Sequence, residues 1–277
     1  MSLRAKPARR FRHARQHSPL RQLTAVAAVI AVLYLAGLAA IVLLSRPDAA
    51  GSPSVTGVRP SRSAATGDGS QTTVRTTIDY PDRGGGTWVV ASRDDTVAGR
   101  SGLLMRYRVA VETGIGHVDV AAFAAQVTAT LADRRSWTGT QRLRLQRVGS
   151  REPADFVVYL ATPATRDRLC PDGPDRYTSC RSGDRVVLNV ARWVHGAAAV
   201  GGDLRSYRQY MVNHEVGHRL GHGHERCPGR GRPAPVMQQQ TLGLHGCRPQ
   251  AWPVARGVEY HGPAGSYDDP VPRSASR

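Results

Sequence analysis

Lysine is almost missing from this chain of 277 residues, and Lys6 is the only one. The formal net charge of +17 therefore comes almost entirely from arginine. Alanine, glycine and proline are abundant too, which is typical of a GC-rich coding sequence and makes the arginine excess weak evidence for a basic function. Beyond the N-terminal segment the arginines are scattered and not interleaved with aromatic residues. We therefore expect no nucleic-acid partner.

Acidic residues are absent before Asp48, and basic residues instead fill the segment 1–22. An uncharged apolar run follows at Leu23–Leu44. A helix of this length spans a bilayer core of roughly 30 Å. The basic flank predicts a cytoplasmic tail over 1–22, with the rest of the chain on the outer face of the cell membrane. Because Pro47 and Asp48 spoil the cleavage site near Ala50, we expect an uncut, single-pass signal anchor over 23–44; the alternative is a cleaved signal peptide.

Cysteine occurs only four times, and no two cysteines form a Cys-x-x-Cys pair. This argues against a zinc site built from cysteines. All four follow the apolar run, so they lie on the expected oxidising side, where an even number indicates disulfides. Three pairings are possible. We favour Cys170–Cys180 and Cys227–Cys247, since each closes a short local loop.

Internal repeats are also absent, and the length allows one good-sized domain with appendages. Residues 45–78 are rich in Ser, Thr, Gly, Pro and Ala, which predicts a flexible linker. Residues 257–277 have a similar composition and predict a disordered tail. A single folded domain is therefore expected over 79–256.

Hydrophobic periodicity within 79–256 predicts both strands and helices. Alternating or β-rich stretches predict strands at 87–91, 103–112, 141–148, 155–161 and 185–191. Helical spacing predicts one helix over 118–133 and a second over 203–221, ending at Gly221. The order indicates an α+β domain with a mixed sheet, and the second helix carries a cluster of histidines. Trp137, Trp193 and Trp252 are expected in the core or in a cleft wall.

The histidine cluster lies in the stretch NHEVGHRLGHGHE, Asn213–Glu225. His214 and His218 are four residues apart, so on a helix both imidazoles can reach one metal ion. Glu215 is displaced by roughly 100° around the same helix and can flank the ion without being a ligand. This is the HExxH arrangement, in which the glutamate acts as general base on water.

A third ligand requires a turn after the helix. If the helix continued, His222 would lie about 12 Å along the axis from His214. That is too far for zinc, whose ligands lie about 2.0–2.1 Å from the ion. Gly221 tolerates the left-handed conformation that ends a helix and reverses the chain. After that turn either His222 or His224 can return to the metal, and spacing alone does not choose between them.

The extended pattern HExxHxxGxxH resembles the signature of the metzincin metallopeptidases. Metzincins also carry a methionine in a tight turn beneath the metal, and Met237 in APVMQQQTLG fits that place. The longer context resembles a family of membrane-anchored or secreted actinobacterial proteins with a metzincin-like domain, over most of 79–256. The resemblance implies one zinc ion per chain, with the ligands His214, His218 and His224, the catalytic base Glu215 and the turn residue Gly221. His222 is then expected outside the ligand set, and His245 and His261 are expected to be ordinary surface residues.

One departure from the metzincin pattern concerns the residue two positions after the methionine. Several metzincins have a tyrosine there that helps to bind the metal or to stabilise the oxyanion, and here it is Gln239. Gln239, Tyr260 or a backbone N–H are the candidates for that role. The resemblance also implies that the strand at 185–191 borders the cleft and pairs with an extended substrate.

These patterns predict a zinc endopeptidase that acts on protein or peptide substrates at the outer face of the cytoplasmic membrane. The alternative is a non-catalytic, zinc-binding interaction module of the cell envelope. Glu215 favours the enzyme, because a structural site of three histidines does not need it. The missing tyrosine at position 239 favours the module.

Overall fold

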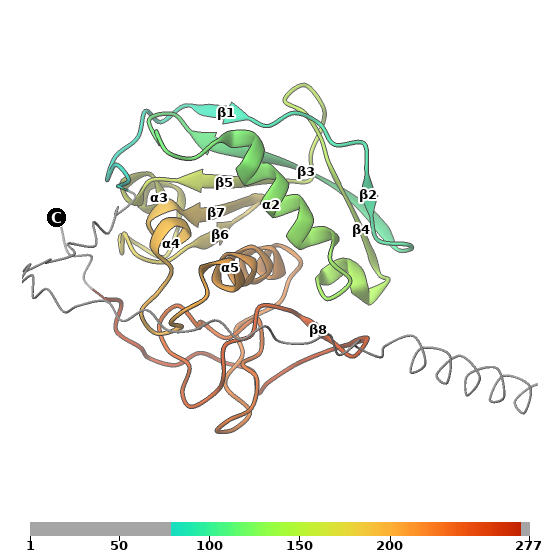
Figure 1. Cartoon of the computed structure of the whole chain (residues 1–277), viewed down its shortest axis with the longest axis vertical. Coiled ribbons are helices and arrows are strands. Elements are labelled where there is room, and N and C mark those ends of the chain that lie inside the picture. Colours follow the sequence, from blue (N-terminus) through green and yellow to red (C-terminus); the bar gives the residue numbers. More distant parts are fainter. Residues whose placement is uncertain (1–78, 273–277) are drawn as a thin grey trace, which may run out of the picture. The chain divides into compact units, whose positions relative to one another are not determined.

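The computed structural model describes residues 79–272 (Figure 1). The predicted cytoplasmic tail, membrane anchor and linker (1–78) lie outside this part of the chain. Within 79–272, no helix is both long enough and apolar enough to cross a bilayer. The described residues form an α+β domain with a mixed sheet of seven strands and four helices, in agreement with the predicted fold class.

The sheet combines parallel strands in its centre with antiparallel strands at its margins. Its strands are β1 (Trp88–Val90), β2 (Val97–Ala98), β3 (Leu103–Glu112), β4 (Leu143–Arg147), β5 (Phe156–Ala161), β6 (Cys180–Ser182) and β7 (Arg185–Asn189). They follow the order β2-β4-β3-β5-β7-β6, with β1 paired to β3. The four strands β3, β4, β5 and β7 are parallel, whereas β1, β2 and β6 run antiparallel to their neighbours. One margin of the sheet is therefore the short antiparallel strand β6.

The helices are α2 (Val120–Ala132), α3 (Pro163–Leu169), α4 (Val190–His195) and α5 (Leu204–Arg219), with a 3₁₀ turn η1 at Trp137–Thr140. The main core lies where α2 and α5 pack on the sheet (Figure 1). Alternation along β7 shows the two faces, because Val186 and Leu188 join this core while Val187 joins a second cluster with Cys170 and Cys180. A small hairpin of β8 (Val254–Ala255) and β9 (Val258–Glu259) follows.

The predicted long elements are present, and their ends are set by caps. The helix expected at 118–133 begins at Val120, because the Asp119 carboxylate accepts a hydrogen bond from the Ala122 N–H at 2.7 Å. The strand expected over 185–191 ends at Asn189, whose side chain accepts from the Ala191 N–H and starts α4. The prediction is therefore wrong for residues 190 and 191, which are helical.

The segment 257–272 also differs from its prediction as a disordered tail. β9 pairs with β8, and Ala264 forms an antiparallel bridge with Glu225. This part of the tail is ordered because its backbone pairs with other segments, although its side chains are mostly small and polar. Amino-acid composition alone does not predict that pairing.

Both expected disulfides are formed, Cys170–Cys180 and Cys227–Cys247. The first closes the loop between α3 and β6. The second links the segment after α5 to the segment after Met237. Two disulfides suggest an extracytoplasmic domain, since such bonds persist in oxidising compartments.

Candidate metal centre

Helix α5 carries the histidine motif, and local interactions fix both of its ends. The Asp203 carboxylate accepts from the Arg205 N–H at 3.0 Å at the start. At the other end Gly221 has φ +96°, the left-handed conformation that the turn required. The His222 N–H then donates to the Gly217 carbonyl at 3.0 Å, which completes a Schellman-type ending. The chain thereby reverses directly after the helix.

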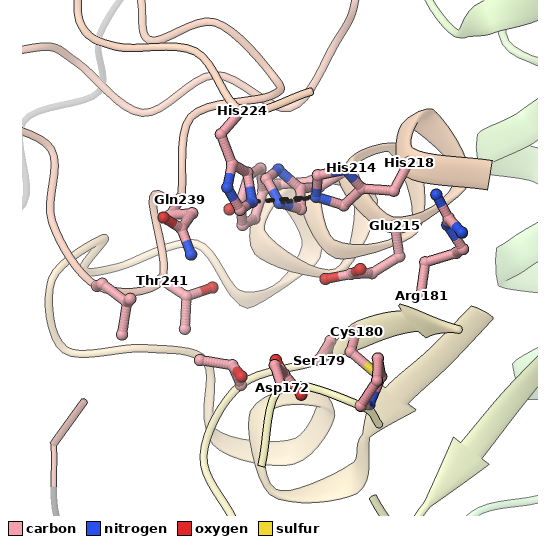
Figure 2. Close-up of a pocket in the computed structure, with 14 residues that line it drawn as sticks. Asp172, Ser179, Cys180, Arg181, His214, Glu215, His218, His224, Gln239 and Thr241 are labelled. Atoms are coloured by element: carbon pink, nitrogen blue, oxygen red, sulfur yellow. Dashed lines mark hydrogen bonds between the residues drawn. The ribbon is translucent and has the colours of Figure 1, made fainter. Parts of the chain in front are cut away.

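The reversal brings the imidazoles of His214, His218 and His224 together (Figure 2). The Nε2 atom of His218 lies 3.2 Å from Nε2 of His214 and 3.1 Å from Nε2 of His224. One ring nitrogen from each of the three residues lies within 4.8 Å of the other two. This triad could hold a metal ion.

Each of the three imidazoles is also held at its other nitrogen. Nδ1 of His214 lies 2.8 Å from the Val236 carbonyl oxygen, and Nδ1 of His218 lies 2.9 Å from the carbonyl oxygen of His222. Nδ1 of His224 lies 3.0 Å from the Ser266 hydroxyl oxygen. Because a carbonyl only accepts, the first two Nδ1 atoms carry the hydrogen, and Nε2 of each neutral ring then presents a lone pair.

Burial keeps these rings uncharged near neutral pH. It lowers the pKa of His214 well below its usual value, lowers the pKa of His218, and lowers that of His224 to about 4. The Nε2 lone pairs of His214 and His218 and the Nε2 atom of His224 gather at one point, with separations of 3.2 and 3.1 Å from His218, and this arrangement fits a bound cation. Neutral imidazole is also the form that binds metal.

His222 contributes its backbone and not its ring. Its imidazole stacks on Trp137, with ring centroids 4.3 Å apart and an interplanar angle of 25°. Its carbonyl oxygen meanwhile orients His218. The structure thus resolves the alternative left by the spacing, because His224 joins the triad and His222 does not.

Glu215 lies beside the triad with its carboxylate directed into the same pocket (Figure 2). Only 6% of its surface is exposed. Its Oε2 atom is buried and has no hydrogen-bond partner among the described residues. Burial raises the pKa of this carboxyl group to about 8, and a cation on the neighbouring imidazoles would lower it again. A buried, unpaired carboxylate oxygen of this kind is suited to bind a water or a substrate proton.

Met237 lies buried beneath α5, and a glycine makes room for it. A Cβ atom at Gly217 would lie 2.4 Å from the Met237 sulfur and 2.7 Å from Cζ2 of Trp137. The Met237 turn in this way stays close enough for the carbonyl of neighbouring Val236 to orient His214. The sequence reading singled out Gly221 and missed Gly217, although a glycine inside a helix between two expected ligands was an available signal.

The far wall of the pocket is formed by residues 171–172 and 178–179 of the loop between α3 and β6, and by Cys180 and Arg181 of β6. The pocket has a volume of about 220 Å³. The fully buried guanidinium of Arg166 holds this loop through Asp172 at 2.8 Å, Asp175 at 3.1 Å and the Thr178 carbonyl at 3.1 Å. The strand that borders the pocket is β6. The implied role of the strand at 185–191 is therefore wrong, because β7 is paired on both sides, with β5 and β6.

The structure shows which candidate oxyanion-stabilising side chains line the pocket and which already have hydrogen-bond partners. Gln239 lines the pocket and makes no side-chain hydrogen bond within the described part of the chain. Tyr260 does not line the pocket, and its hydroxyl donates to the Pro233 carbonyl at 3.0 Å. Tyr210 does line it, but its hydroxyl is occupied by the Gln238 carbonyl and the Gln240 N–H.

The remaining singled-out residues lie outside the triad. Trp137, Trp193 and Trp252 are buried in the main core. His245 bonds Asp269 at 2.8 Å, and His261 bonds Glu225 at 2.7 Å.

No curated protein and no solved structure matches this sequence. A family model does match, over residues 74–251, and this range includes the triad, Glu215 and Met237. The chain therefore belongs to the family described as "Protein of unknown function (DUF3152)".

Proposed function

We propose that this chain is a zinc-dependent endopeptidase of the metzincin type. The observation that carries the proposal is the buried Glu215 carboxylate, with an unpaired oxygen, beside three neutral imidazoles that face one another. Two atoms that each lie 2.0–2.1 Å from zinc at a tetrahedral angle are separated by about 3.3–3.4 Å. The Nε2 separations of 3.2 and 3.1 Å fit that requirement. Three protein ligands leave one position open, as in catalytic zinc sites.

When bound, zinc supplies a Lewis acid and lowers the pKa of water to about 7. The hydrogen bonds at Nδ1 fix the orientation of each ligand ring, and the two carbonyl partners also fix the tautomers of His214 and His218. Glu215 takes the proton of the attacking water and passes it to the leaving amine nitrogen. The Gln239 amide faces the same pocket and can donate a hydrogen bond to the oxygen on which charge develops.

Strand β6 supports a peptide as the substrate. Among the described strands it pairs only with β7, and Cys180 and Arg181 of this strand line the pocket. Unpaired backbone groups at a sheet edge bind an extended peptide by adding it as a further strand.

The decisive variant is Glu215→Gln, which keeps the size of the side chain and removes the basic oxygen. We expect the variant to retain full zinc and to cleave about 10²- to 10⁴-fold more slowly, the usual contribution of a positioned general base. Zinc content and cleavage of a denatured protein are measured on the same preparation, with and without a chelator. Glu152→Gln is the matched control, because that carboxylate bonds Arg93 and does not line the pocket.

Two results would count against the enzyme. A Glu215→Gln protein that cleaves as fast as wild type contradicts the general-base role. A fully zinc-loaded wild-type protein that cleaves nothing in a broad peptide library favours the alternative, a non-catalytic zinc-binding module of the cell envelope. The presence of Gln239 in place of tyrosine is the feature that favours this alternative.

A further inference from the structure

A segment at the C-terminal end, residues 260–269, runs along the stretch that carries the third histidine; we call it the C-terminal strap. The Gly265 N–H donates to the His224 carbonyl at 2.9 Å. The Arg226 N–H donates to the Pro263 carbonyl at 2.7 Å. These two backbone hydrogen bonds fix the register of the strap against residues 224–226.

That register places Ser266 behind the His224 ring. The Ser266 hydroxyl lies 3.0 Å from Nδ1 of His224, on the side of the ring opposite to the triad. His214 and His218 are oriented by carbonyls 22 and 4 residues away, whereas the partner of His224 is 42 residues away. The orientation of the third imidazole therefore depends on a segment that folds back from far along the chain.

Two glycines let the strap approach this closely. A Cβ atom at Gly262 would lie 2.2 Å from the Arg226 carbonyl oxygen and 2.6 Å from Cγ of Pro235. Gly265 has φ +123°, and a Cβ atom there would lie 2.8 Å from Nη2 of Arg226. A side chain at position 262 would push the strap away from the backbone that it pairs with, and at position 265 the left-handed backbone conformation itself favours glycine.

The strap is fastened at both ends by side chains. At its start the Tyr260 hydroxyl donates to the Pro233 carbonyl at 3.0 Å. Near its end the Tyr267 ring stacks on His245 at 3.5 Å, and Asp269 bonds the same imidazole at 2.8 Å. These contacts hold Ser266 at His224 and leave the pocket open, because no strap residue lines it.

We propose that the C-terminal strap is part of the metal centre and that Ser266 is its positioning residue. A metal at Nε2 would leave the hydrogen of His224 on Nδ1, which donates to the Ser266 hydroxyl oxygen, and this hydrogen bond holds the ring orientation. The inference rests on the metal-binding part of the proposed function and extends beyond the matched family region, which ends at residue 251. Metal affinity then depends on the C-terminal strap.

The test compares serine variants of the purified full-length chain. Ser266→Ala removes the acceptor, and we expect zinc and cobalt affinity, measured by competition with a chromophoric chelator, to fall about 10- to 100-fold. Ser266→Thr keeps the hydroxyl and should restore affinity close to wild type. Ser101→Ala is the matched control, because that exposed hydroxyl also makes one hydrogen bond, to the Gln141 carbonyl, and lies outside the strap.

Two readouts separate positioning from general destabilisation. The absorption spectrum of bound cobalt should change in Ser266→Ala, because the field of the third imidazole changes, while the thermal midpoint of the metal-free protein stays at the wild-type value. Gly262→Val, which displaces the strap and leaves Ser266 in the sequence, should lower affinity as well. Wild-type affinity and an unchanged cobalt spectrum in Ser266→Ala would overturn the inference.

The measurements do not use a substrate, so the two proposals fail separately. A variant series that behaves as expected in a protein without cleavage activity supports the strap and removes the peptidase. A wild-type protein that binds neither zinc nor cobalt overturns both.

Discussion

Four histidines lie between residues 214 and 224, and each has its own environment. His214 is the most buried, His218 follows one turn later on α5, and His224 returns after the Gly221 turn. His222 lies inside that turn with its ring on Trp137. His224 is therefore a candidate ligand, whereas His222, two positions earlier, orients His218 through its carbonyl oxygen.

The pair His222→Ala and His224→Ala tests this division. His224→Ala removes one Nε2 donor of the triad, so we expect the protein to lose stoichiometric zinc on dialysis. His222→Ala removes a ring that lies away from the triad and keeps the carbonyl that orients His218. It should retain zinc close to one ion per chain. Elemental analysis after dialysis measures the zinc content of both variants. Loss of zinc in His222→Ala and retention in His224→Ala would show that His222, and not His224, is the third ligand.

Spacing along one helix predicted His214, Glu215 and His218, since the helical repeat fixes their relative positions. The choice of His224 over His222 needed the resemblance, because a turn has no fixed period. Ser266 could not be predicted at all. Its role depends on a backbone pairing across some forty residues, and a serine in a polar tail gives no signal of it.

At the scale of elements, the loop from α3 to β6 makes one wall of the cleft and is held from inside. Arg166 is fully buried, and besides its carboxylate partners it donates to the Gly173 carbonyl at 2.7 Å. The disulfide Cys170–Cys180 closes the same loop. A covalent link and a buried cation together hold a segment that has no helix or strand of its own.

Arg166→Met should show how much the buried cation contributes. The substitution takes the guanidinium away from Asp175 and Asp167, which are mostly buried, and leaves Asp167 only its ion pair with Arg176. It also breaks hydrogen bonds to two carbonyls. Loss of one member of a buried ion pair typically costs about 3–5 kcal/mol. Because Asp172 is half exposed, we expect the lower end of that range, about 3 kcal/mol, in the free energy of unfolding measured with urea.

Arg168→Met is the control for this measurement, since its exposed guanidinium bonds only Thr165 within the described residues. We expect a much smaller change in the free energy of unfolding. Equal losses in the two variants would show that the buried cation does not hold the loop.

The long elements were predictable because their signals are local. Asp203 and Gly221 bound α5, and the expected range 203–221 differs from the observed Leu204–Arg219 by at most two residues. The short strands β2 and β6 were not predicted, since two or three residues carry no period and are defined by the strand they pair with. Helix α3 was missed for a similar reason, because its buried residues include Thr165 and Arg166 in place of an apolar stripe.

At the scale of the whole domain, the part of the site that follows α5 in the chain has little regular structure. Between the end of α5 and the start of β8 at Val254, the described chain contains no helix or strand. This stretch nevertheless supplies His224, the carbonyl of Val236 and Met237. Cys227–Cys247 and the C-terminal strap help to hold it in place, together with hydrogen bonds from Tyr210 and His214 of α5, and a bound metal would add a further constraint. The two disulfides suggest an extracytoplasmic environment for the domain.

The last prediction concerns that environment, because it depends on how the entire chain is oriented across the membrane. The apolar run 23–44 lies outside the described residues, and its basic flank predicts that everything after it is exported. A reporter enzyme that needs disulfides, fused after residue 70, should be active in cells, while a reporter that folds only in the cytoplasm should be silent at the same position. Fusions after residue 20, before the apolar run, are the control and should give the opposite pattern. If only the cytoplasmic reporter is active after residue 70, the predicted orientation is wrong. Peptide mapping of the exported protein under non-reducing conditions tests the disulfides separately, and four free thiols would contradict them.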